Sequence, residues 1–404
     1  MKIHVKGNLR DLLAFRGLGR KRKKQIARAP ARANGPDPVN QLADRLHPDR
    51  QYLTIAEVVE ETGSTRSFKL VPDAARSANG LAPFRAGQYL SLKVCAAGTA
   101  ITRPYSIASA PYEALGSEGY YQITIRREPG GFLTRHLWEH WSEGTRIESS
   151  GPCGTFYYEP LRDAHKITGL AGGSGATPFR SMAREIVYGD LGAELLLLYG
   201  SSDEDDIVFY EEFKMLEEEA PDRIRVVHVL SCDEVTLAGC EQGFITAGTI
   251  RKYADVENSS FFICGPPAMY SFVEQELASL ELPRRRIRRE VFGTPKEIQG
   301  APGYPQEAGD RTHQVTVRIG GARIQVPAQA SEPVLVALER AHLQPPSQCR
   351  SGECGFCRAQ LVSGEVYILP DSDGRRAADK KFGYFHPCAS YPLSDLEINI
   401  PRDA

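Results

Sequence analysis

The chain has 404 residues, of which 41% are hydrophobic and 25% charged, and its formal net charge is −2. This length predicts two or three domains, and the composition excludes a disordered or fibrous chain. The near-neutral charge excludes general binding to polyanions, and we find neither a run of apolar residues long enough to span a bilayer nor an export signal. Nine cysteines without such a signal favour a reducing, cytoplasmic location.

Residues 1–50 are strongly basic, with 13 Lys or Arg and 4 Asp or Glu residues. Leu9, Leu12 and Leu13 have helical spacing, and the run Arg20–Lys24 precedes a stretch rich in Ala, Pro and Gly. We expect a partly helical extension that buries little apolar surface. It could be a solvated tail, dock to a partner, or adsorb to an anionic membrane surface. Nucleic-acid binding is not expected, because no recognition motif accompanies the charge.

Residues 51–157 contain short runs of alternating apolar and polar residues, separated by Gly and Pro. The clearest runs are 54–58, 67–70, 89–94 and 121–125. Such spacing predicts an antiparallel β-barrel domain.

Residues 158–297 have a different pattern, in which continuous apolar runs alternate with helical stretches. The predicted strands are 166–171, 195–199, 225–230 and 261–264, and the predicted helices include 178–188 and 210–219. This alternation predicts an α/β domain with a parallel sheet covered on both faces.

Residues 298–310 are rich in Gly and Pro and are expected to form a linker to a third domain, residues 311–404. A hairpin over 314–326 and one helix over 335–342 predict a small α+β domain. This domain has 11 basic and 10 acidic residues, so electrostatic steering of a partner by its net charge should be weak.

Four cysteines near the C-terminus have the spacing of a plant-type [2Fe–2S] site: Cys349, Cys354, Cys357 and Cys388. Gly352 and Gly355 would let backbone N–H groups approach the sulfides of a cluster. Zinc is the alternative metal, although it usually binds paired C-x2–4-C motifs. The third interpretation is that these four cysteines are buried thiols with a structural role and bind no metal. The dispersed Cys95, Cys153, Cys232 and Cys240 are interpreted as ordinary packing residues.

The barrel region contains the tetrapeptide Arg103-Pro104-Tyr105-Ser106. A flavin needs a cation for its phosphate, an aromatic ring beside the isoalloxazine, and a hydroxyl near N5, and all three side chains occur here. The tetrapeptide alone is also compatible with an ordinary barrel strand.

Together with its neighbouring motifs, the tetrapeptide resembles the ferredoxin–NADP reductase family. These motifs are Phe84-Arg85-Ala86-Gly87-Gln88-Tyr89, Gly130-Gly131-Phe132-Leu133-Thr134 and Gly151-Pro152-Cys153-Gly154-Thr155-Phe156. With the cysteine loop, residues 51–404 resemble reductases of the phthalate dioxygenase and phenylacetyl-CoA epoxidase types, which carry a C-terminal, β-grasp-like ferredoxin domain.

The resemblance implies roles for several residues of the barrel domain. Arg103 would hold a flavin phosphate, and Tyr105 and Ser106 would contact the isoalloxazine. Gly131, Leu133 and Thr134 would bind the pyrophosphate at a helix N-terminus. FAD is the expected flavin, and FMN, which some relatives use, is the alternative.

Two further motifs indicate a nucleotide site in the α/β domain. The glycine turn 172–178 contains Gly173, Gly175 and Thr177, and its glycines would let the backbone approach a pyrophosphate. Cys264-Gly265-Pro266 ends a later strand, and the resemblance implies that Cys264 lies near the hydride path; a small core residue is the alternative.

Phe292 and Asp203 are expected to affect the flavin and the choice of nucleotide, respectively. Phe292 would cover the isoalloxazine until nicotinamide displaces it, or would be a core residue at the sheet end, and the role of its neighbour Glu290 is open. Asp203 begins four consecutive carboxylates, 203–206, which would repel a 2′-phosphate. NADH is therefore expected rather than NADPH, unless a cation arrives from another loop.

The predicted function is an NAD(P)H-dependent oxidoreductase that passes electrons from NADH through FAD and a [2Fe–2S] cluster to a protein acceptor. An oxygenase, an anaerobic redox partner and a membrane quinone complex are all compatible acceptors. A non-catalytic redox sensor or docking subunit that uses the cluster is the alternative function.

Overall fold

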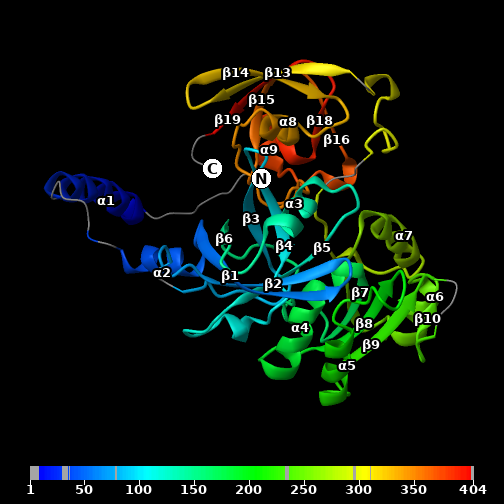
Figure 1. Ribbon diagram of the computed structural model, residues 1–404. Helices are drawn as coiled ribbons and strands as arrows, with labels where there is room; N and C mark the ends of the chain where they lie inside the picture. Colours follow the sequence, from blue (N-terminus) through cyan, green and yellow to red (C-terminus); the bar gives the residue numbers. More distant parts are fainter. Residues whose placement is uncertain are drawn as a thin grey trace. The chain divides into compact units, whose positions relative to one another are not determined.

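The computed structural model describes residues 9–29, 35, 37–77, 80–232, 236–293, 297–309 and 311–401 (Figure 1). The chain divides into two units, Met1–Asp44 and Arg45–Ala404. The first unit contains helix α1 (Leu9–Arg28) and most of α2 (Pro38–Leu46). No helix in the described ranges has both the length and the apolar character needed to cross a membrane.

The basic run of the first unit lies on helix α1. The side chains of Arg20–Lys24 are exposed, as are those of Leu18 and Ile26. The side chains of Leu9, Leu12 and Leu13 lie outside the described part of the chain. The predicted partly helical extension is thus helical over residues 9–28.

The first sheet of the second unit is antiparallel and six-stranded, in the order β4-β3-β6-β1-β2-β5. Its strands are β1 (Gln51–Thr62), β2 (Thr65–Pro72), β3 (Tyr89–Ala96), β4 (Thr99–Ser106), β5 (Tyr121–Arg126) and β6 (Arg146–Ser149). A bridge between Ile107 and Ile123 joins its two edges, so the sheet curls into the expected barrel. A 3-10 turn (Pro111–Ala114) and helix α3 (Phe132–His140) complete the domain. Alternating residues such as Phe68, Leu90 and Ile123 fill the interior.

The second sheet is parallel throughout, in the order β10-β9-β8-β7-β11-β12. Its strands are β7 (Lys166–Gly172), β8 (Glu194–Ser201), β9 (Ile224–Leu230), β10 (Glu241–Gln242), β11 (Ser259–Cys264) and β12 (Ile287–Glu290). The flanking helices are α4 (Thr177–Tyr188), α5 (Tyr210–Glu219), α6 (Ala247–Tyr253) and α7 (Pro267–Ala278), with 3-10 turns at Gly173–Ala176 and Arg284–Arg286. Separate apolar cores cover the two faces, as predicted.

The strand order of the parallel sheet reverses between β7 and β11. In open α/β sheets, ligands bind at such a switch point, outside the carboxyl ends of the strands. The glycine turn follows β7, and Cys264-Gly265-Pro266 lies at the end of β11. The fold therefore brings the two predicted nucleotide motifs to neighbouring strand ends.

The third sheet is mixed, in the order β14-β13-β19-β15-β17. Its strands are β13 (Thr312–Ile319), β14 (Ala322–Gln329), β15 (Ala359–Ser363), β17 (Tyr384–Phe385) and β19 (Leu396–Ile400), and β16 (Val366–Ile368) pairs separately with β18 (Ser390–Pro392). Helix α8 (Val334–Arg340) packs on β14. Helix α9 (Ala377–Lys381) lies beside β17, and 3-10 turns occupy Gln306–Ala308, Pro370–Ser372 and Pro387–Ala389. The predicted helix 335–342 thus begins one residue earlier and ends at Arg340.

The segment predicted as a loose linker is packed where the structure describes it. Ile298, Tyr304 and Ala308 are buried in a small core with Tyr367 and Tyr391. Residues 294–296 and 310 lie outside the described ranges. Composition favoured a linker because Gly and Pro are frequent here, but the few apolar side chains are enough to dock the segment on the third domain.

Candidate functional site

Strand β4 positions the predicted flavin-binding side chains. Arg103 donates a hydrogen bond to the Thr102 carbonyl at 2.9 Å and has no carboxylate hydrogen-bond partner among the described residues. Burial, together with the nearby Arg350, lowers the pKa of Arg103 to about 10, so the guanidinium is still charged at neutral pH. Burial raises the pKa of Tyr105 to about 12, so its hydroxyl stays protonated. A partly buried, charged guanidinium of this kind is suited to a phosphate group.

Ser106 contacts a carboxyl group that the sequence left undecided. Its hydroxyl donates to Glu290 Oε2 at 3.3 Å, and both side chains are buried. Burial raises the pKa of Glu290 well above its usual range, and Glu353 adds to the shift. Burial thus favours the neutral form of the Glu290 carboxyl group, beside the predicted flavin hydroxyl partner.

The predicted pyrophosphate site lies at the start of helix α3. Gly131 immediately precedes the helix, and a Cβ there would lie only 2.5 Å from Thr134 Oγ1. The Thr134 hydroxyl accepts the Glu128 N–H at 3.1 Å, and the Leu133 side chain is buried in the barrel core. Leu133 can therefore offer only its backbone N–H at the helix N-terminus, whereas Thr134 can offer its backbone N–H and the O–H of its hydroxyl.

The glycine turn after β7 packs directly on the end of β11. A Cβ at Gly175 would lie 2.1 Å from the Cys264 carbonyl oxygen, and one at Gly172 would lie 2.6 Å from Met269 Sδ. Gly173 has φ +53°. The Thr177 hydroxyl donates to the Ser174 carbonyl at 2.7 Å. Side chains are thus excluded where the turn meets Cys264.

Tyr270 ties the ends of β11 and β12 together. Its hydroxyl donates to the Glu290 carbonyl and accepts the Gly265 N–H at 3.2 Å. Cys264 is buried, and burial raises the pKa of its thiol well above the usual range, so this thiol is neutral. Cys264 and Glu290 are aligned partners across β11 and β12, and Ser106 joins them through Glu290.

The four carboxylates after β8 do not all point to solvent. Glu204 accepts the N–H groups of Thr236 and Leu237 at 2.5 and 2.7 Å. Asp206 pairs with Arg126 of the barrel at 2.5 Å, while Asp203 Oδ1 accepts the Asp206 N–H at 3.0 Å.

Arg126 is a cation that the sequence analysis missed. Its Nη1 would lie 3.0 Å from a Cβ at Gly173, so this barrel residue reaches the glycine turn. A basic residue at the end of β5 carries no local signal, because its neighbour in space, Gly173, is almost 50 residues away in the sequence.

The four predicted cluster cysteines come together in the third domain. The sulfurs of Cys357 and Cys388 are 3.4 Å apart, and the Cys354 N–H lies 3.4 Å from the Cys349 sulfur. Hydrogen bonds from the Cys354 and Cys388 thiols lower the pKa of Cys349, which favours the thiolate that metal binding requires.

The cysteine loop depends on two glycines with left-handed backbone. Gly352 and Gly355 have φ +83° and +73°, and a Cβ at Gly352 would lie 2.4 Å from the Ser372 carbonyl oxygen. Among the described residues, no three His, Cys, Asp or Glu side chains surround one point as a single metal ion requires. The loop and the sulfur separations therefore fit a two-iron cluster rather than a single metal ion.

The cysteine loop adjoins the barrel residues of the flavin site. The Cys153 sulfur lies 3.8 Å from Gln348 Oε1, next to Cys349 in the sequence. Burial raises the pKa of Tyr89, with further contributions from Cys349 and Cys354. The Tyr89 ring also packs edge-to-face on Phe292, with centroids 5.4 Å apart. Phe292, which is partly exposed, thus lies at the same junction.

A buried ion pair joins Arg350 of the cysteine loop to helix α8, near Arg103. Glu339 of α8 accepts hydrogen bonds from Arg350 at 2.5 and 3.0 Å, and both side chains are buried. Glu339 raises the pKa of Arg103, whereas Arg350 lowers it. Arg350 has φ +59°, an uncommon backbone conformation for a residue other than glycine. One carboxylate therefore stabilises two cations at the contact between the barrel and third domains.

Helix α4 links the flavin and nucleotide motifs. Arg180 Nη1 donates to the Ala108 carbonyl at 2.8 Å, and the Ser181 hydroxyl donates to the Ser109 carbonyl at 2.6 Å. Residues 108 and 109 follow the Arg103–Ser106 tetrapeptide, and α4 begins at the glycine turn. Two hydrogen bonds from α4 thus connect the segment after the flavin tetrapeptide to the helix that follows the glycine turn.

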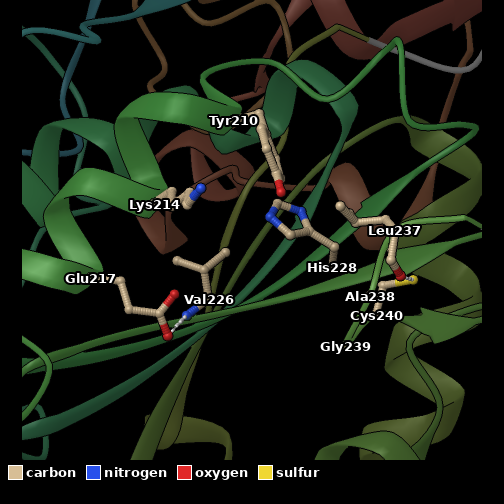
Figure 2. Close-up of a pocket in the computed structure, with 9 residues that line it drawn as sticks. All are labelled: Tyr210, Lys214, Glu217, Val226, His228, Leu237, Ala238, Gly239 and Cys240. Atoms are coloured by element: carbon tan, nitrogen blue, oxygen red, sulfur yellow. Dashed lines mark hydrogen bonds between the residues drawn. The ribbon is translucent and has the colours of Figure 1, made fainter.

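A separate cavity of about 200 Å³ lies between α5 and β9 (Figure 2). The Tyr210 hydroxyl points toward the His228 ring, and Lys214 and Glu217 line the same cavity. Burial lowers the pKa of His228 to about 4, so this imidazole is neutral. None of the predicted cofactor residues lines this cavity.

Comparison with known families matches each domain. Residues 53–158 match the family described as oxidoreductase FAD-binding domain, residues 170–275 the oxidoreductase NAD-binding domain, and residues 317–393 the 2Fe-2S iron-sulfur cluster binding domain.

Similar proteins have the same order of domains along most of their length. The chain is 31% identical over 350 residues to the "3-ketosteroid-9-alpha-monooxygenase, ferredoxin reductase component" of Mycobacterium tuberculosis, covering 85% of this chain and 93% of that protein. It is 27% identical over 363 residues to the "Glycine betaine monooxygenase reductase subunit" of Pseudomonas aeruginosa, covering 87% and 95%. The crystal structure of phthalate dioxygenase reductase aligns with a TM-score of 0.60 at 24% identity, covering 87% of this chain and 97% of that chain, which supports the fold.

The three family matches, the extended similarity and the converging cofactor motifs agree. The chain belongs to the ferredoxin–NADP reductase-like oxidoreductases that carry a C-terminal ferredoxin domain, and it passes electrons from NADH through FAD to a [2Fe–2S] cluster.

Proposed function

We propose that this chain is the reductase component of a two-component oxygenase system and works in a reducing, cytoplasmic compartment. The relatives named above are reductase components of monooxygenases, and none of the nine cysteines forms a disulfide. The observation that carries the proposal is the contact between the cysteine loop and the flavin site, through Cys153–Gln348 and Tyr89. An internal donor held against the cluster suits a chain that delivers single electrons to a separate acceptor.

The barrel residues fit FAD, which when bound accepts a hydride and releases electrons singly. Arg103 would hold a phosphate with its partly buried guanidinium, and Tyr105 would lie against the isoalloxazine. Ser106 would place its hydroxyl near the reacting edge, oriented by Glu290 at 3.3 Å. The Gly131, Leu133 and Thr134 backbone at the start of α3 would bind the pyrophosphate.

The nucleotide would bind at the switch point of the parallel sheet. Gly173, Gly175 and Thr177 would seat its pyrophosphate, with Arg126 supplying positive charge beside the turn. Cys264-Gly265-Pro266 would border the nicotinamide. Phe292 would shield the flavin from water until the nicotinamide takes its place, and its partly exposed ring is compatible with movement.

Cys349, Cys354, Cys357 and Cys388 would hold the cluster, with Gly352 and Gly355 letting backbone N–H groups approach it. The Cys349–Cys354 side lies toward Tyr89 and the barrel. The Arg350–Glu339 pair keeps this side of the loop in place.

The proposal is tested with anaerobic purified protein and NADH as the only reductant. We expect the flavin absorption to bleach and the electron paramagnetic resonance signal of a reduced [2Fe–2S] cluster to follow. Addition of an oxygenase component should reoxidise the cluster. Cys388→Ser is expected to lose the cluster signal while NADH still bleaches the flavin.

Two outcomes would contradict the proposal. One is flavin that bleaches with NADH while the intact cluster stays oxidised. The other is a reduced cluster that no oxygenase component reoxidises faster than buffer does.

A further inference from the structure

The cluster loop has a donor side and an outer side. The donor side faces the barrel, where Cys349 and Cys354 lie near Tyr89 and Gln348 lies near Cys153. Because the chain's own barrel occupies this side, a protein acceptor must approach the cluster from another direction.

The outer side carries an exposed aromatic ring between two cluster cysteines. Phe356 is 38% exposed, and its N–H lies 3.5 Å from the Cys354 sulfur. Arg358, two residues on, is exposed and lies over the Tyr384 ring at 5.8 Å. Two exposed side chains therefore lie within four residues of a cluster cysteine on this side of the loop.

The buried His386 contacts both the cluster loop and helix α9. His386 Nδ1 lies 2.5 Å from the Gly352 carbonyl oxygen, and His386 Nε2 lies 3.9 Å from the buried Asp379 of α9. A Cβ at Gly374 would lie 2.8 Å from the Glu353 Cα. These contacts hold the segment 374–382 beside the cluster loop.

The outer residues of α9 and its flanks are basic and aromatic. We call the following exposed residues the basic collar: Phe356, Arg358, Arg376, Lys380, Lys381 and Phe382. Phe382 is 61% exposed, and Lys381 lies over its ring at 5.5 Å. Lys380 pairs with Asp373 at 3.0 Å, whereas Arg358, Arg376 and Lys381 have no carboxylate partner among the described side chains.

We propose that the basic collar is the electron-exit surface of this reductase and docks an acidic surface next to the redox centre of its acceptor protein. The near-neutral net charge of the domain conceals this local excess of cations beside the cluster. Unpaired cations steer an acidic partner and accelerate encounter, and exposed rings add apolar contact without a long-lived complex. The inference rests on the proposed function, since it requires electrons to leave from the cluster.

The test uses two probes that differ in surface charge, native cytochrome c, which is basic, and its succinylated form, which is acidic. The holoprotein with NADH should reduce the succinylated form faster at low salt, and this rate should fall several-fold as salt is raised. Native cytochrome c should show no such fall. Arg376→Glu/Lys381→Glu should slow reduction of the succinylated form about tenfold at low salt and abolish its salt dependence.

The matched control is Arg284→Glu/Arg285→Glu, which makes the same charge change at the amino end of β12, where both side chains are exposed. This control should behave as the wild type. Equal effects of the two double variants, or no effect of the collar variant, would overturn the proposal. Anaerobic reduction of the cluster by NADH is measured in every variant, and its loss in the wild type would instead contradict the proposed function.

Discussion

Burial raises the pKa of the Glu290 carboxyl group well above the usual range and so favours its protonated form in the folded protein. In the unfolded chain the same group ionises above about pH 4.5. Burial of the protonated Glu290 therefore costs no stability at pH values below the unfolded-state pKa. The free energy of unfolding of the wild type falls as the pH rises from there toward the folded-state pKa.

Glu290→Gln mimics the protonated carboxyl and removes the penalty of ionisation. We expect its unfolding temperature to equal that of the wild type near pH 3.5, below the unfolded-state pKa, and to exceed it increasingly toward pH 8.5. Because Glu290 orients Ser106, NADH reduction of the flavin should slow about tenfold. Thermal unfolding across pH and stopped-flow flavin bleaching measure the two effects. A stability difference that does not change with pH would show that Glu290 is ionised in the folded protein.

Nucleotide choice is predicted to depend on Asp203, whose exposed carboxylate follows β8. Asp203→Asn keeps an oxygen for the Asp206 N–H, bonded at 3.0 Å, but removes the charge. We expect the ratio of kcat/KM for NADH over NADPH to fall about fivefold, because an exposed charge contributes about 1 kcal/mol.

The control for this prediction is Glu204→Gln, because Glu204 is already engaged by Thr236 and Leu237. Its steady-state ratio should stay close to that of the wild type. If Glu204→Gln changes the ratio more than Asp203→Asn does, the charge that repels the 2′-phosphate lies at Glu204.

Helix α1 belongs to a unit of its own and carries the exposed run Arg20–Lys24. Removal of residues 1–44 should leave NADH-dependent reduction of ferricyanide within about twofold of the full chain, because every residue assigned to the cofactors lies beyond Asp44. Steady-state rates and cofactor content of the two proteins test this. Loss of flavin or of activity would mean that the extension supports the catalytic unit.

Glu339 of the third domain stabilises the positive charges of two arginines, Arg350 in its own domain and Arg103 in the barrel domain. Glu339→Gln would leave a buried guanidinium unpaired, at a cost of about 3 kcal/mol in unfolding free energy. We also expect slower electron transfer from flavin to cluster, since the pair holds the loop next to Arg103. Denaturant unfolding and the rate at which the reduced-cluster signal appears after NADH addition test the two effects.

Glu332→Gln is the matched control, because Glu332 pairs with the half-exposed Arg340 in the same domain. Both the unfolding free energy and the rate of cluster reduction should stay near the wild-type values. A change in stability without a change in cluster reduction for Glu339→Gln would limit its role to folding.

Much of the fold and cofactor content follows from local pattern. The 4–2 cysteine loop, the tetrapeptide at Arg103 and the alternating strands are each encoded within a few consecutive residues. Glu290, Arg126 and Glu339 escaped assignment because each acts through a residue far along the chain, such as Ser106, which precedes Glu290 by 184 positions.

The amino-acid sequence by itself was enough to predict the three-domain architecture, the four candidate cluster cysteines and the candidate flavin motif, because local periodicity and side-chain chemistry indicate these. Tertiary structure alone decided which carboxylates after β8 are engaged by other residues, which carboxyl group faces Ser106, and which residues of the cysteine loop are exposed. Those properties depend on burial and on charges brought together by folding, and neither is present until distant segments pack.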